Sequence, residues 1–185
     1  MKTRARARSA TASAAVLAVA ALTLLAGCAP TVTLHPAPQH ANDPHCADVE
    51  VRLPSSLDSG GSGQLARRDT DAQSTAAWGD PTSVIYSCGV PVPGATTLPC
   101  IQIDGAVYWI RQEDAAKKVW VFTTFGRDPA VQLTVSTSLS PGVVLDQLGT
   151  AVDFLPKNGH VCTSTEDTVT GESLPSDTPT PTPTP

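Results

Sequence analysis

A cysteine within a strand-forming stretch, directly after a tight turn, constrains the fold of this 185-residue chain more than any other feature. Gly79 and Pro81 frame the turn, because glycine permits a sharp bend and proline pushes the preceding Asp80 towards an extended backbone. Val84–Val90 is rich in strand-forming residues and contains Cys88. We therefore expect a turn that leads into a core strand, which a disulfide fixes to another part of the chain.

The first 27 residues have the features of a bacterial lipoprotein signal peptide. Residues 1–8 carry the basic side chains, residues 10–26 are apolar, and Leu25-Ala26-Gly27-Cys28 resembles a lipobox. In such signals the bond before the cysteine is cut and the cysteine carries a diacylglycerol, so Cys28 is the expected lipidation site. A transmembrane helix is disfavoured, because about 17 apolar residues lie at the short limit for a span. We expect a lipid anchor on the extracytoplasmic face of the cell membrane.

Composition divides the rest of the chain into three parts. Residues 28–43 are rich in Pro, Thr, Ala and His and predict a flexible tether, and residues 163–185 predict a disordered Thr/Pro-rich tail. This tail is either an O-glycosylation site or a plain solubilising segment. Between them, residues 44–162 are the expected single folded domain.

Charge argues against nucleic acid as a partner. The formal net charge is −5, and four of the twelve basic residues but none of the seventeen acidic ones precede Cys28. Removal of residues 1–27 therefore leaves a net charge of −9. An acidic domain of this kind is repelled by nucleic acid and by anionic lipid.

The first half of the domain predicts few regular elements besides the strand already described. Cys46, Val49 and Leu53 share helical spacing before Pro54 ends the element. Residues 55–64 are Ser- and Gly-rich and predict a loop, and residues 67–77 predict a helical turn.

The second half predicts a hairpin, two further strands and a helix. Asp104-Gly105 joins Cys100–Ile103 to residues 106–110 and is typical of a type I′ hairpin turn. Residues 118–125 are apolar in both alternating sets, which predicts a central strand covered on both faces. Two further patterns follow: alternation at Val131, Leu133 and Val135, and a helix from Ser140-Pro141 with Val144, Leu148, Ala151, Val152 and Leu155 on one face. The expected fold is α+β, with a mostly antiparallel sheet of four to five strands packed against a C-terminal helix.

Four cysteines remain once Cys28 is assigned to lipid: Cys46, Cys88, Cys100 and Cys162. An even number in an exported domain predicts two disulfides, for which three pairings are possible. Zinc is the rival interpretation, but the chain contains no Cys-x-x-Cys pair.

Six short segments of the domain form a recognisable set: residues 76–81, Cys46 with Leu53-Pro54, Cys88-Gly89-Val90-Pro91, Val107-Tyr108-Trp109, Phe125-Gly126-Arg127 and residues 144–148. Together they resemble the exported proteins of high-GC Gram-positive bacteria known as the domain of unknown function 3515 family. Members carry an arginine where this chain has Ser87, so no role of that arginine carries over. The shared cysteines imply a Cys46–Cys88 disulfide and hence Cys100–Cys162. The resemblance implies location and fold but no reaction, ligand or catalytic residue.

Three groups of residues suggest chemistry. His35, His40, His45, Asp43 and Cys46 contain metal-binding side chains, but their spacing is irregular and we expect a solvated linker with no metal and no cofactor. A hydrolase or transferase would rely on Asp80 with Arg127 or His160, although no complete catalytic motif is present. Aromatic rings and an arginine suit a binding cleft, and its candidates are Trp78, Tyr108, Trp109, Trp120 and Arg127.

We take the binding interpretation as the main hypothesis. Its candidate residues are Trp78, Asp80, Trp109 and Arg127, and no residue is assigned a catalytic role. The expected partner, besides the membrane, is an envelope protein or a wall component. The enzyme with Asp80, Arg127 and His160 remains the alternative.

Overall fold

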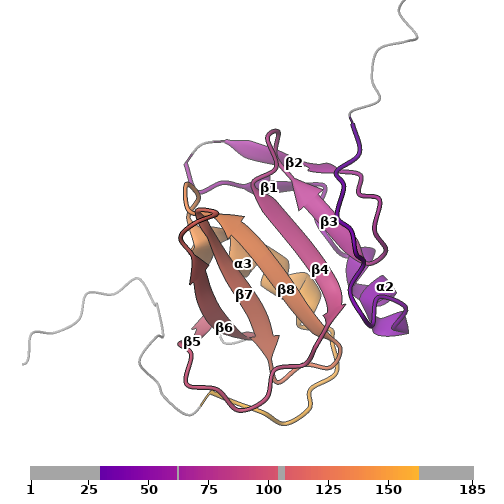
Figure 1. Cartoon of the computed structure of the whole chain (residues 1–185), viewed down its shortest axis with the longest axis vertical. Helices are drawn as coiled ribbons and strands as arrows, with labels where there is room; N and C mark the ends of the chain where they lie inside the picture. The colour runs from indigo at the N-terminus through magenta and orange to yellow at the C-terminus, as the bar shows by residue number, and fades with distance from the viewer. Residues whose placement is uncertain (1–29, 62, 104–106, 163–185) are drawn as a thin grey trace, which may run out of the picture. The chain divides into compact units, whose positions relative to one another are not determined.

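An antiparallel sheet of eight strands, curled around one helix, is the framework of the domain (Figure 1). The computed structural model describes residues 30–61, 63–103 and 107–162. Within these ranges the helices are α2 (Pro44–Glu50) and α3 (Pro141–Val152). The strands are β1 (Ser56–Asp58), β2 (Gln64–Arg68), β3 (Thr75–Trp78), β4 (Val84–Val90), β5 (Cys100–Ile103), β6 (Val107–Asp114), β7 (Val119–Phe125) and β8 (Ala130–Ser136).

The strand order is β1-β2-β3-β4-β8-β7-β6-β5, and every neighbouring pair is antiparallel. The pairing of β4 with β8 joins the two halves of the sheet. Helix α3 packs against β8 and against both edge strands, β1 and β5. The sheet therefore curls until both of its edges reach the same helix.

The two faces of the sheet differ, and we call them the core face and the outer face. The core face carries the buried rings of Trp78, Trp109, Tyr86 and Phe122, and α3 covers it. Figure 1 shows α3 on the far side of β7 and β8, so the viewer looks onto the outer face. Alternation in β8 follows the prediction, since its apolar residues are buried on the core face and its polar residues are half-buried on the outer face.

The strand count of four to five is corrected to eight. Strand β1 and the first residue of β2 lie within residues 55–64, where a loop was expected. The end of β2 and most of β3 lie within residues 67–77, where a helical turn was expected. The reason is that β2 is a polar strand near the edge, half-buried or exposed along its length, so its pattern lacks a hydrophobic stripe. Strand β1 is only three residues long, and hydrogen bonds between Asp58 and Gln147 of α3 hold it in place.

Strand β7 is internal, as predicted, but it is covered on one face only. Phe122 and Thr124 are buried on the core face, whereas Val121 and Thr123 on the outer face are half-buried. An antiparallel sheet tolerates this arrangement because its outer face can stay in contact with water. The β5–β6 hairpin is also present, with Ile103 paired to Val107, while the predicted type I′ turn lies outside the described residues.

The segment before α2 differs from the predicted tether. Within residues 30–43, Val32 forms a bridge to Thr70, and the backbone N–H of His40 donates to the carbonyl of Gly89 at 2.8 Å. Gly89 permits this contact, because its φ is +85° and a Cβ there would lie 2.3 Å from the His40 carbonyl group. The described part of the segment is therefore held against the sheet, and the compact unit begins at Thr31.

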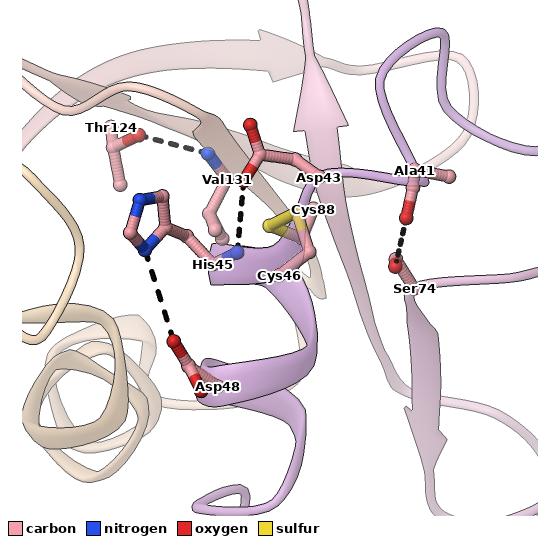
Figure 2. Close-up of a disulfide and its surroundings, with 9 residues drawn as sticks. All are labelled: Ala41, Asp43, His45, Cys46, Asp48, Ser74, Cys88, Thr124 and Val131. Atoms are coloured by element: carbon pink, nitrogen blue, oxygen red, sulfur yellow. Dashed lines mark hydrogen bonds and ion pairs between the residues drawn. A yellow bond between two sulfur atoms is a disulfide. The ribbon is translucent and has the colours of Figure 1, made fainter.

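Two disulfides fix the ends of the domain to the sheet, with the pairing that the resemblance implied. Cys46 of α2 is bonded to Cys88 of β4, and both residues are completely buried (Figure 2). Asp43 begins the helix by accepting a hydrogen bond from the His45 N–H at 2.8 Å. The second disulfide joins Cys100 of β5 to Cys162.

Candidate functional site

The two tryptophans proposed for binding lie in the core. Trp78 and Trp109 both have an exposed fraction of 0%, and the indole N–H of Trp78 donates to the Pro54 carbonyl at 3.1 Å. Trp120 is half-buried on β7, beside the guanidinium of Arg111. Trp78 and Trp109 therefore offer no open face of the kind that a ligand would stack on.

Asp80 lies far from the other candidates. It is exposed in the turn before Val84, and its carboxylate pairs with Arg68 at 3.4 Å. Arg127 lies beyond the opposite end of the same strand pair, because Val90 of β4 pairs with Ala130 of β8. Seven residues of extended chain separate these ends by about 20 Å. The structure therefore does not bring Asp80 together with Arg127 or His160.

Arg127 is buried and bound to the end of α3. Its guanidinium donates to the carbonyls of Asp153 and Leu155, at 3.0 Å and 2.8 Å, and forms an ion pair with the Asp153 carboxylate. The exposed fraction of the Arg127 side chain is 3%. These partners fix the helix end to the sheet, so the main role of Arg127 is structural.

The chain that follows α3 crosses the end of the sheet, and we call residues 156–162 the C-terminal strap. Its carbonyl at Pro156 accepts from the Asp128 N–H at 3.1 Å, and its Asn158 N–H donates to the Gly126 carbonyl at 3.0 Å. At Gly126 φ is +82° and a Cβ would lie 2.2 Å from the His160 carbonyl oxygen. Only glycine admits the strap at this distance.

Two hollows of about 160 Å³ and about 220 Å³ lie between the strap and strands β5 to β7, and together we call them the strap groove. They share Phe125 and Val161. The side chains that matter for recognition are Gln102, Tyr108, Phe125, Lys157, His160 and Leu98. By register, Gln102, Tyr108 and Phe125 form one row across three strands of the outer face.

The groove contains three rings and neutral or basic polar groups. The rings of Phe125 and His160 are stacked with centroids 5.5 Å apart, and Tyr108 is half-buried beside them. Lys157 is exposed, and none of the residues described as lining the groove is a carboxylate. Such a site can stack a planar or sugar-like group and hydrogen-bond to neutral or anionic oxygen atoms.

The strap groove therefore brings Tyr108, a candidate of the binding hypothesis, together with His160, a candidate of the enzyme hypothesis. Arg127 belonged to both hypotheses and contributes only a buried edge to the groove. Gln102, Phe125 and Lys157 were not proposed as binding residues. Phe125 belongs to a motif of the family resemblance, but nothing in the sequence placed the strap over it.

A larger hollow of about 490 Å³ lies between α3 and strands β5 and β6. Val107 and Trp109 form its floor, but their exposed fractions are 1% and 0%, so the hollow is shallow. Its accessible rim includes Phe154, which is 63% exposed and lies under the guanidinium of Arg52 at 4.3 Å. The strap groove gathers the rings of Tyr108, Phe125 and His160 next to Gln102 and Lys157, whereas Phe154 is the one accessible ring among the described residues at this hollow, so the strap groove is the better candidate site.

The proposed metal ligands are used in other contacts. Cys46 is in a disulfide, Asp43 caps α2, and His35 lies 3.3 Å from the Asp71 carboxylate. The Leu34 N–H that donates to Asp71 lowers the pKa of this carboxyl below its usual value. Within residues 30–61, 63–103 and 107–162 no three His, Cys, Asp or Glu side chains gather as a metal site.

Fold and site define an α+β protein in which a curled antiparallel sheet holds one helix, and a disulfide-bonded strap closes a groove on the outer face. The chain belongs to the family described as Protein of unknown function (DUF3515), whose profile matches residues 8–159. Comparisons with curated proteins and with solved structures gave no match. In the part of the chain that the structure describes, no helix is long and apolar enough to cross a membrane.

Proposed function

We propose that this protein is an extracytoplasmic lipoprotein, anchored through Cys28, whose domain binds an envelope protein or a wall component without catalysing a reaction. The strap groove is the observation that carries the proposal. It brings the rings of Tyr108, Phe125 and His160 together with the amide of Gln102, next to the exposed Lys157. Rings with a few polar groups are typical of a recognition site.

The signal sequence and the two disulfides support the extracytoplasmic location. Disulfides persist in oxidising compartments, and both pairs in this domain are bonded. The lipobox-like Leu25-Ala26-Gly27-Cys28 supplies a lipidation site directly before the compact unit that begins at Thr31.

The anchor is tested by replacement of its cysteine. We expect Cys28→Ser to abolish fatty-acid labelling in a bacterial host that processes lipoproteins, and to release the protein into the medium, because no diacylglycerol can then be attached. Metabolic labelling and fractionation check this. A Cys28→Ser protein that is still labelled would refute the anchor but would leave the binding proposal untouched.

The groove is tested by binding to purified envelope fractions from the source bacterium. We expect Tyr108→Ala to weaken binding by about tenfold, since truncation of an interface ring commonly costs about 1–2 kcal/mol. Phe154→Ala is the matched control, because this ring is 63% exposed but lies outside the groove. Equal binding by the wild type and Tyr108→Ala, with a loss in Phe154→Ala, would place the site at α3 instead.

A further inference from the structure

The Thr/Pro-rich tail, residues 163–185, leaves the folded domain at the strap groove. Cys162 is the last residue before the tail, and it lines the groove together with Val161. The bond from Cys162 to Cys100 of β5 holds this point at the edge of the sheet. The tail itself lies outside the described residues, but its point of departure is therefore fixed beside the groove.

The tail is long enough to lie along the groove. Residues 178–185 are a Thr-Pro repeat, and fifteen residues separate this repeat from Cys162. A chain of that length can span up to about 50 Å. Gln102, Tyr108 and Phe125 lie in one row on three neighbouring strands, so the first and the last of them are only about 10 Å apart. The repeat can therefore reach every ring of the groove.

The chemistry of the repeat matches the lining of the groove. Alternating proline favours polyproline II, in which residues three positions apart share one face. Each face of the repeat then alternates proline rings with threonine hydroxyls. Grooves lined by aromatic side chains are the usual receptors of such segments. Tyr108, Phe125 and His160 supply the rings here, and the amide of Gln102 lies beside them.

Charge favours the same occupant. The tail has no lysine or arginine, and its acidic residues are Glu166, Asp167, Glu172 and Asp177. Residues 28–162 contain thirteen acidic and eight basic residues, so the domain as a whole repels the tail. The strap groove is an exception, because the residues described as lining it include no carboxylate and do include the exposed Lys157.

We infer that the Thr-Pro repeat, residues 178–185, binds in the strap groove of its own chain and excludes other ligands from it. The inference rests on the proposed function, in which this groove recognises an envelope protein or a wall component. The covalent link raises the effective concentration of the repeat at the groove to about the millimolar range. A ligand must displace the repeat, so the protein binds this ligand more weakly than an open groove does.

Backbone amide NMR of the purified full-length protein tests the contact. The tail variant replaces Pro179, Pro181 and Pro183 together by alanine. We expect it to shift the amide signals of Gln102 and Tyr108, because the repeat no longer packs on the rings beside them. The signals of α3, outside the groove, are expected to stay unchanged. The wild-type signals are expected to be the same on dilution, since the contact lies within one chain.

Two controls identify the cause of these shifts. A synthetic peptide of residues 178–185, added to the tail variant, is expected to return the two groove signals towards their wild-type positions. A second variant, Thr180→Ser with Thr182→Ser, keeps every proline and every charge and is expected to give wild-type signals. Groove signals that are unchanged in the tail variant, or wild-type signals that move on dilution, would overturn the inference.

Binding to envelope fractions separates this inference from the proposed function. We expect the tail variant to bind at least about twofold more tightly than the wild type, because a repeat that occupies half of the grooves halves the apparent affinity. If Tyr108→Ala weakens binding but the tail variant binds like the wild type, the groove is the site and the tail does not occupy it. If the NMR shifts appear but no envelope fraction binds either protein, the tail contact stands and the proposed function fails.

Discussion

Replacement of Cys46 and Cys88 together by alanine is expected to lower the free energy of unfolding by at least about 4 kcal/mol. The two residues are 42 positions apart, and release of a loop of that length costs about 4 kcal/mol in the chain-entropy description. Both side chains are completely buried in the core, so the loss of packed sulfur adds to this cost. A domain of this size is only about 5–15 kcal/mol more stable than its unfolded chain.

Cys100 and Cys162 supply the matched control. Their separation of 62 residues predicts a similar entropic effect, but both residues are half-buried and the bond holds only the end of the strap. We therefore expect the second double alanine variant to be the less destabilised of the two. Urea unfolding of both variants measures the difference in their free energies of unfolding. The dependence of this free energy on urea concentration is checked to show that unfolding remains two-state. A larger loss in the Cys100 and Cys162 variant would show that the strap contributes more than the core contact.

Elements with a clear periodic pattern were predictable from the sequence, and polar elements were not. Strand β4, strand β8 and helix α3 each bury residues on one face, and these residues are apolar at the spacing of a strand or a helix. Strand β2 carries Arg67 and Arg68 and is half-exposed, so nothing in its composition separates it from a loop. Its pairing with β3 is a tertiary contact that short-range patterns do not contain.

The candidate site was predicted less well than the fold, for a physical reason. Tryptophan and arginine were proposed because an aromatic face can stack on a ligand and arginine can pair with a carboxylate, but both residue types are equally suited to burial. Trp78, Trp109 and Arg127 are buried here, and the polar atoms of Trp78 and Arg127 bond to backbone carbonyls. The strap groove arises where residues 156–162 return to β5–β7, and this return depends on Gly126 and on the Cys100–Cys162 bond. A contact between segments so far apart in the chain leaves no pattern in the sequence of either segment.

Arg127 is the second position at which a large effect is expected. Arg127→Met keeps most of the apolar stem but leaves the carbonyls of Asp153 and Leu155 without their guanidinium donor. An unpaired buried polar group costs about 1–3 kcal/mol, so we expect the free energy of unfolding to fall by about 2–4 kcal/mol. Arg127→Lys should recover only part of this loss, because an ammonium group cannot reproduce the planar fork of the guanidinium.

Asp153→Asn removes the ion pair between Arg127 and the Asp153 carboxylate but leaves the hydrogen bonds from Arg127 to the carbonyls of Asp153 and Leu155. The Asp153 side chain is 45% exposed, so loss of its charge should cost less than about 1 kcal/mol, while both carbonyls keep their donor.

Since Arg127 holds the chain just before the strap, Arg127→Met should also speed amide hydrogen exchange at Asn158, whose N–H bonds to Gly126. If Asp153→Asn proves as damaging as Arg127→Met, the carboxylate rather than the carbonyls anchors the strap. If neither variant changes exchange at Asn158, the strap is held independently of the Arg127 side chain, by its backbone hydrogen bonds and by Cys100–Cys162, and Arg127 serves only to fix the end of α3.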